Sequence, residues 1–169
     1  MGTQEHKKNA PRQVTIGILS ISSTRTLSDD ESGRWIGKTA LKEGHKVVFH
    51  QVIPDDSTTI AAVVQKLIRQ HAPQAVLLTG GTGITPKDVT IEAVRPLFNK
   101  ELTAFGPLFS QLSYEEIDSA AMLSRATAGV VDKTVVFCMP GSLKACKLAC
   151  NALIFPELGH LVSHVQSSG

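Results

Sequence analysis

Only three of the 169 residues are cysteines, and this scarcity excludes a disulfide framework. Cys138 follows an apolar run, and Cys146 and Cys150 lie four residues apart within a predicted helix. No histidine neighbours them at the spacing of a metal site. We therefore expect three small, buried side chains in a reducing cytosol.

The sequence also lacks a long apolar run, so it predicts no membrane span. Its first residues are polar and lack the apolar stretch of a signal peptide. The length suits one domain with a sizeable core. We interpret residues 1–13 as a disordered tail and residues 14–166 as a single domain, and we predict a cytoplasmic protein.

An excess of charge of either sign is absent as well. The formal net charge is +2, and Lys7, Lys8 and Arg12 against Glu5 place that surplus in the tail. The body from Val14 onward is neutral overall, which argues against a polyanionic partner. We expect no nucleic-acid binding.

What the chain does contain is a regular alternation of strand and helix patterns. Strands are predicted over residues 14–20, 46–53 and 75–79, and helices over residues 32–43, about 57–72 and 91–98. The alternation predicts a three-layer α/β fold with a mostly parallel sheet and helices on both faces. The short, apolar run at 75–79 is typical of the sheet centre.

The C-terminal half is predicted to be more varied. A helical face begins at Phe105, and residues 115–123 suit a short additional helix. Residues 126–131 and 134–139 flank a turn and predict an antiparallel hairpin. Ser142 is placed to cap the last helix, which Pro156 interrupts.

A glycine-rich loop directly after the third predicted strand carries the strongest chemical signal. It reads Thr79, Gly80, Gly81, Thr82, Gly83. Three glycines let the backbone turn tightly and present N–H groups to a ligand, and the threonines add hydroxyl groups. The spacing is neither that of a Walker loop nor that of a dinucleotide fingerprint. Because ligands bind beyond the carboxyl ends of parallel strands, we predict a phosphate-bearing ligand, with a plain tight turn as the alternative.

Two carboxylates are candidates for a shared metal site. Asp88 follows the glycine loop, and Asp55 follows the second predicted strand. Carboxylates from adjacent strand ends can bind Mg²⁺ jointly beside phosphates, as phosphoryl or nucleotidyl transfer requires. The alternative for both residues is a helix cap.

Further small polar residues are predicted to reach the same edge from other loops. They are Ser22, Ser23, Ser124, Arg125, Pro140, Gly141 and Ser142. Arg125 either pairs with an anionic group or forms a salt bridge. Convergence of several loops favours a ligand site over an isolated turn.

Together these residues resemble the MoaB/Mog family of molybdenum-cofactor biosynthesis. The match rests first on the glycine loop followed by Asp88, Val89 and Thr90, and it spans about residues 14–164. Further matching positions are Phe105, Gly106, residues 112–117, residues 123–126, residues 139–142, Lys144, Ala145 and residues 156–158. The segment 112–117 and the short C-terminus are more similar to the MoaB branch. Ser23 stands where many members have an aspartate.

The resemblance implies a molybdopterin-binding α/β domain that forms homotrimers or homohexamers. It implies molybdopterin adenylyltransferase activity with Mg²⁺, with ATP and molybdopterin as substrates and no permanently bound cofactor. Asp55 and Asp88 would be the catalytic and Mg²⁺-binding residues, and the loops would hold the pterin phosphate and the nucleotide. A non-catalytic molybdopterin carrier is the second hypothesis, and an oligomeric scaffold is the third.

Overall fold

The computed structural model describes residues 10–167. The predicted tail over residues 1–9 lies outside the described residues. Residues 10–13 lie against the domain: a β-carbon placed on Gly159 would be 2.6 Å from the carbonyl oxygen of Pro11. The Gln13 amide also donates a hydrogen bond to the Gly44 carbonyl at 3.3 Å. These four residues therefore pack with the domain.

Strands and helices alternate along the chain, as predicted. The strands are β1 (Thr15–Ile21), β2 (Lys46–Ile53), β3 (Ala75–Thr79), β4 (Lys100–Glu101), β5 (Thr127–Val131) and β6 (Thr134–Met139). The α-helices are α2 (Glu31–Lys42), α3 (Ser57–His71), α4 (Thr90–Val94), α5 (Phe105–Ile117), α6 (Leu143–Ala149) and α7 (Phe155–Gln166). Shorter helical segments are the 3₁₀ turns η1 (Arg95–Leu97) and η2 (Asp118–Leu123) and the π-helical turn η3 (Cys150–Ile154).

Six strands form one sheet in the order β2-β1-β3-β6-β5-β4. The first four are mutually parallel, β5 is antiparallel to β6, and β4 is antiparallel to β5. The mostly parallel sheet and the β5–β6 hairpin are thus confirmed. Because the chain leaves β1 for β2 on one side and returns to β3 on the other, β1 and β3 flank a topological switch point.

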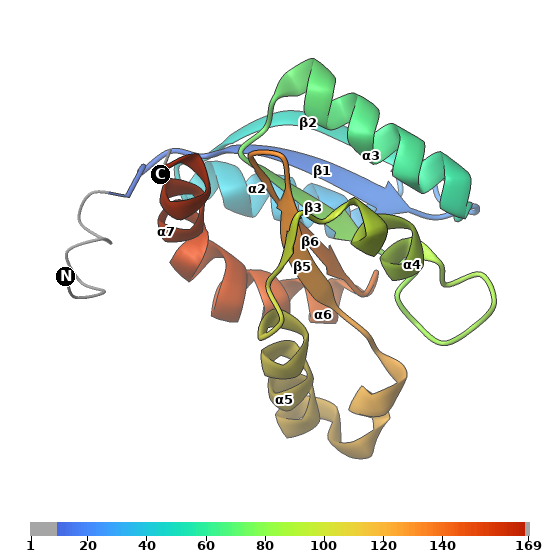
Figure 1. Ribbon diagram of the computed structural model, residues 1–169. Helices are drawn as coiled ribbons and strands as arrows, with labels where there is room; N and C mark the ends of the chain where they lie inside the picture. Colours follow the sequence, from blue (N-terminus) through green and yellow to red (C-terminus); the bar gives the residue numbers. More distant parts are fainter. Residues whose placement is uncertain (1–9, 168–169) are drawn as a thin grey trace.

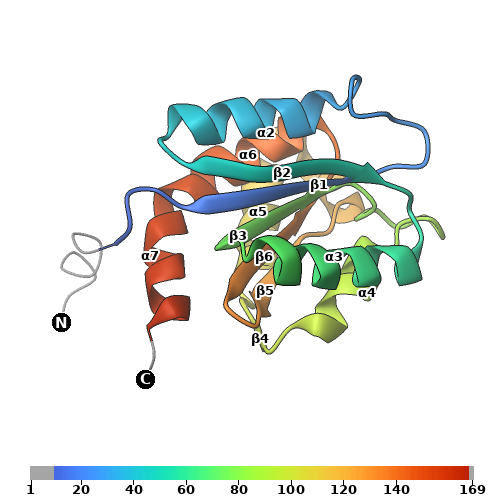
Figure 2. The same ribbon diagram turned by 90° about the horizontal axis from the view of Figure 1, so that it is seen from above.

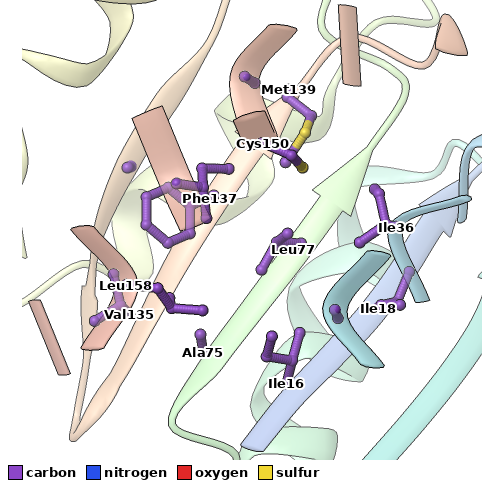
Figure 3. Close-up of a cluster of buried hydrophobic side chains, with 14 of the residues drawn as sticks. Ile16, Ile18, Ile36, Ala75, Leu77, Val135, Phe137, Met139, Cys150 and Leu158 are labelled. Carbon is purple, nitrogen blue, oxygen red and sulfur yellow. The ribbon is translucent and has the colours of Figure 1, made fainter. Parts of the chain in front are cut away.

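Helices cover both faces of this sheet, which confirms three layers (Figures 1 and 2). Helices α2, α5, α6 and α7 pack on one face, and α3 and α4 pack on the other. Alternate side chains of each central strand face opposite layers, so Leu77 of β3 joins Ile18 and Phe137 in the first core (Figure 3). Its neighbour Leu78 joins the second core. Burial on both faces explains why these strands are nearly continuous apolar runs.

Besides residues 10–13, which were expected in the tail, three elements differ from the sequence prediction. The helix expected over residues 91–98 is the shorter α4 followed by η1. The edge strand β4 has only two residues and was not predicted, because so short a strand has no periodic pattern. Helix α5 continues to Ile117, so the expected extra helix over residues 115–123 is its last turn followed by η2. The C-terminal helix is interrupted near Pro156, as predicted. The π turn η3 separates α6 from α7, and Pro156 lies in the first turn of α7.

Within residues 10–167, no helix combines the length and the apolarity that a membrane crossing would require.

All three cysteines are free and buried, as the sequence predicted. Burial raises the pKa of Cys138 and of Cys146 to about 12, and it also raises the pKa of Cys150. Since the thiolate is the reactive form, these side chains serve as core residues.

We expect none of the three thiols to react with Ellman's reagent at pH 8 in the native protein. All three should react at once in concentrated guanidinium chloride, because unfolding restores solvent access and an ordinary thiol pKa. Absorbance of the released thionitrobenzoate counts the thiols in each state. Rapid release of one equivalent from the folded protein would contradict the buried assignment.

Candidate functional site

The carboxyl ends of β1, β2, β3 and β6 lie at one edge of the sheet, where the connecting loops gather (Figure 2). We call this edge the rim and define it by the loops 22–30, 54–56, 80–89 and 140–142. Two of these loops touch: a β-carbon on Gly141 would lie only 3.1 Å from the Cα of Gly80. On the other side, a β-carbon on Gly80 would lie 2.5 Å from the Ile21 carbonyl oxygen. The glycine loop is therefore wedged between the ends of β1 and β6.

The backbone of the glycine loop has the conformation that its sequence requires. Gly80 and Gly81 have φ angles of +93° and +66°, in the left-handed region that favours glycine. Thr90, the first residue of α4, holds this turn through two hydrogen bonds. Its hydroxyl donates to the Gly80 carbonyl at 2.8 Å, and its amide donates to the Gly81 carbonyl at 3.0 Å.

The two threonines of the loop have different surroundings, although the sequence suggested the same role for both. The hydroxyl of Thr79 points inward and donates to Ser20 at 3.3 Å. Thr82 is only 2% exposed, and its hydroxyl has no hydrogen-bond partner among the described residues. Because buried polar groups are nearly always paired, Thr82 is the better candidate for a ligand contact.

A buried carboxylate, hydrogen-bonded to a histidine ring, lies next to the rim. Asp30, at 0% exposure, accepts hydrogen bonds from the hydroxyl of Ser20 at 2.5 Å and from the amide of Gly33 at 3.1 Å. Its other contact is the His50 ring at 2.7 Å. Burial acts to raise the pKa of Asp30, but these hydrogen bonds outweigh it and the pKa is lowered. Asp30 thus connects the start of α2 to His50 of β2 and, through Ser20 and Thr79, to the first residue of the glycine loop.

The loop after β1 connects to the first candidate carboxylate. Ser22 shapes this loop, since its hydroxyl accepts from the amides of Thr24 and Arg25. Ser23 donates from its hydroxyl to the carboxylate of Asp55, whose amide donates back to Ser23 at 3.3 Å. Ser23 therefore orients Asp55.

Asp88 folds back over the other end of the glycine loop. Its Oδ2 accepts from the amide and hydroxyl of Thr85, at 2.9 and 2.7 Å. A β-carbon on Gly83 would lie 2.7 Å from the same oxygen. Burial acts to raise the pKa of Asp88, but the Thr85 and Gly83 hydrogen bonds and the nearby Arg125 charge lower it overall. Asp88 is thus held as an anion next to the loop.

Arg125 packs against the glycine loop, and its guanidinium has hydrogen-bond partners within the protein. It donates to the carbonyls of Thr82, Gly83 and Asp88, and it pairs with the Glu92 carboxylate. Arg25 offers a different cation at the rim: its Nη1 lies 4.0 Å from the β-carbon position of Gly141. No hydrogen bond or ion pair of its guanidinium occurs within the described part of the chain.

Ser124 and Ser142 share a cavity next to the rim. Both border a cavity of about 130 Å³ between α5 and α6. The hydroxyl of Ser142 accepts from the Ala145 amide at 3.2 Å, so it caps α6 as predicted. The carbonyl of Pro140 accepts from the Cys146 thiol at 3.2 Å. The carbonyl of Gly141 accepts from the Ser32 hydroxyl at 2.8 Å. These residues shape the β6 loop that meets Gly80.

The donor set at the rim fits Mg²⁺ better than a metal held wholly by protein. Within residues 10–167 there is no group of three or more histidine, cysteine, aspartate or glutamate side chains that would enclose a metal. Asp55 and Asp88 supply hard carboxylate oxygens from two loops of the rim, 54–56 and 80–89. Mg²⁺ is usually held by one or two carboxylates together with substrate phosphates and water.

Sequence reasoning did not point to Asp30, His50 or Glu92. The position of Asp30 before a helix is a detectable capping signal. The pairing of His50 with it depends on how β2 lies beside β1. Glu92 meets Arg125 across 33 positions of sequence, and no local pattern records that contact.

The fold and the rim define an open α/β protein with a glycine loop at the switch point of its sheet. A family model described as "Probable molybdopterin binding domain" matches residues 17–160. The chain therefore belongs to the molybdopterin-binding-domain family, as the resemblance to MoaB and Mog predicted.

Full-length relatives place the chain on the MoaB branch of this family. It is 48% identical to "Molybdenum cofactor biosynthesis protein B" of Bacillus cereus over 162 residues, which cover 95% of this chain and 96% of that protein. It is 38% identical to "Molybdopterin adenylyltransferase" of Pyrococcus furiosus, with 98% and 99% covered. A crystal structure of molybdenum cofactor biosynthesis protein B matches with a TM-score of 0.89 and 46% identity, over 93% of this chain and 98% of that chain.

Replacing Asp30 with alanine should destabilise the protein at pH 7 by roughly 3 kcal/mol or more, because it leaves His50 and Ser20 without their buried partner. The folded-state pKa of Asp30 lies below its ordinary value of 3.8. Its stabilising effect is therefore present above that value and is lost as the pH falls through the folded-state pKa. Urea denaturation at pH 7 and pH 3 measures the difference, which should shrink at pH 3.

The matched control is Asp29→Ala, which removes the adjacent but exposed carboxylate. It should have a much smaller effect. Equal losses of stability in the two variants would rule out a special contribution from the buried pair.

Proposed function

We propose that this protein adenylylates molybdopterin with Mg-ATP in molybdenum-cofactor biosynthesis. The observation that carries the proposal is that two carboxylates lie on neighbouring loops of the rim: Asp55 follows β2 and is held by Ser23, and Asp88 lies beside Gly83 at the end of the glycine loop. The full-length identity to an adenylyltransferase supports the same activity.

The residues of the rim suit transfer of a nucleotidyl group to a phosphate. The terminal phosphate of molybdopterin attacks the α-phosphorus of ATP, and pyrophosphate leaves. The glycine loop offers backbone N–H groups and the hydroxyl of Thr82 to a phosphate, and Arg25 adds a positive charge at the rim. Asp55 and Asp88 would hold Mg²⁺, which when bound offsets negative charge on the phosphates. The protein contributes chiefly by positioning the two substrates.

A non-catalytic molybdopterin carrier is the second candidate. Its support is that Bacillus and other relatives bear the name of a biosynthesis protein without a stated activity. Incubation with molybdopterin, ATP and Mg²⁺ separates the two functions. Pyrophosphate release supports the enzyme, whereas binding of molybdopterin without release supports the carrier.

Asp88→Asn should reduce adenylylation on the order of 10²–10³-fold, because an amide binds Mg²⁺ more weakly than a carboxylate and the metal would offset the charge of the transition state. The fold should survive, because an asparagine oxygen can still accept from Thr85. Pyrophosphate release in the presence of Mg-ATP and molybdopterin is the measurement. Full activity in this variant would disprove the metal-binding role.

Asp132→Asn is the matched control. It makes the same exchange in the β5–β6 turn, at the opposite end of β6 from the rim. Asp132 has a φ of +55°, a conformation that asparagine tolerates. This variant should keep the activity of the unmodified protein.

We further propose that the protein is a homo-oligomer assembled through α5 and η2. The apolar side chains of Leu108, Tyr114, Ile117, Met122 and Leu123 are exposed there. Helix α5 projects away from the sheet (Figure 1). Clustered exposed apolar side chains are typical of a protein contact surface.

The double variant Met122→Lys/Leu123→Lys should dissociate the oligomer. Light scattering after size exclusion should then give a lower molar mass than for the unmodified protein. The introduced charges would have to be buried in the interface. Leu41→Lys on α2, where the native side chain is 61% exposed, is the control and should leave the mass unchanged. An unchanged oligomer in the double variant would place the interface elsewhere.

A further inference from the structure

The side chain of Arg125 packs against the glycine loop and hydrogen-bonds to two of its carbonyls and to one beyond it. Its Nε donates to the carbonyl oxygens of Thr82 at 3.1 Å and Gly83 at 3.0 Å, and its Nη2 donates to that of Asp88 at 3.3 Å. One guanidinium thus joins the glycine loop to the segment that ends in a candidate catalytic residue.

These contacts determine which way the peptide groups of the loop face. A trans peptide is planar, so its N–H points opposite to its carbonyl. With the Gly83 carbonyl turned toward Arg125, the amide of Ile84 faces the other way. The carbonyl oxygens carry partial negative charge and would repel a phosphate. Binding them to Arg125 keeps them away from the ligand side of the loop.

Glu92 holds the guanidinium in this position. Both of its carboxylate oxygens accept from Arg125, through Nη1 and Nη2. The hydrogen bond from Arg125 lowers the pKa of Glu92, and the same bond raises the pKa of Arg125. Glu92 lies on α4, whose first residue, Thr90, binds the Gly80 and Gly81 carbonyls. The same short helix therefore supports both halves of the loop.

We propose that Arg125 and Glu92 are positioning residues that hold loop 82–88 in its ligand-binding form. In this assignment Arg125 does not bind the phosphate of the ligand. Its donors are directed at backbone carbonyls, and Glu92 balances its charge. That loop 82–88 binds the ligand rests on the proposed function, whereas the support of its backbone by Arg125 does not.

Glu92→Gln distinguishes this role from direct phosphate binding. Glutamine keeps the shape but removes the charge that orients Arg125. If Arg125 serves the loop, the KM for Mg-ATP or molybdopterin should rise about tenfold, because the charge-assisted hydrogen bonds are weakened. If Arg125 binds phosphate directly, the same change frees its charge and the KM should stay constant or fall. A constant or lower KM would overturn the proposal.

Hydrogen exchange gives a readout that does not depend on activity. Amides of residues 82–90 should exchange about tenfold faster in Glu92→Gln than in the unmodified protein, because the loop opens more often. Arg125→Lys should show the same effect, since lysine lacks the planar fork that reaches several carbonyls. Unchanged exchange in both variants would also overturn the proposal.

Glu101→Gln is the matched control. Glu101 pairs with Arg95 in a neighbouring ion pair and accepts from the Thr127 hydroxyl, and none of these hydrogen bonds involves residues 82–88. Neither the exchange of the loop nor the KM should change in this variant. If the unmodified protein shows no adenylylation, the proposed function fails, and the exchange comparison still decides whether Arg125 and Glu92 hold the loop.

Discussion

The parallel pairing of β3 with β1 on one side and β6 on the other is the constraint on which the rest of the structure depends. It brings the Gly80 turn into contact with Ile21 and Gly141, three segments far apart in sequence. Side chains larger than hydrogen at Gly80 or Gly141 would force these loops apart. The glycines therefore serve the close packing of strand ends as much as the approach of a ligand.

Charged side chains at this edge of the sheet divide into two groups. Asp30 and Arg125 face inward, where buried or half-buried partners use up their hydrogen-bonding capacity. Asp55 and Arg25 belong to the rim: Arg25 lies within the loop that follows β1, and Asp55 is hydrogen-bonded to Ser23 of the same loop. Rigid internal pairs hold the loops in place, and the exposed charges are left to act on a ligand. Preorganisation of this kind is what a reaction that depends on positioning needs.

Much of the fold could be predicted because its signals are local. The apolar run at β3, the cap at Ser142 and the break at Pro156 are each visible within a few residues. Details that depend on long-range contact could not be predicted. Arg125 illustrates the difference: the sequence allowed an anion partner or a salt bridge, and the choice depended on Glu92 lying beside it in space.

The sequence by itself determined the alternation of strands and helices, the glycine loop and the family to which the chain belongs. These follow from hydrophobic periodicity, turn chemistry and motif spacing, all of which are local in the chain. Only the tertiary structure decided that Thr79 faces inward and Thr82 is unpaired, that Ser23 orients Asp55, and that Arg125 binds the loop. The direction of a side chain at a strand end depends on which loops pack against it, and that packing exists only once the sheet has formed.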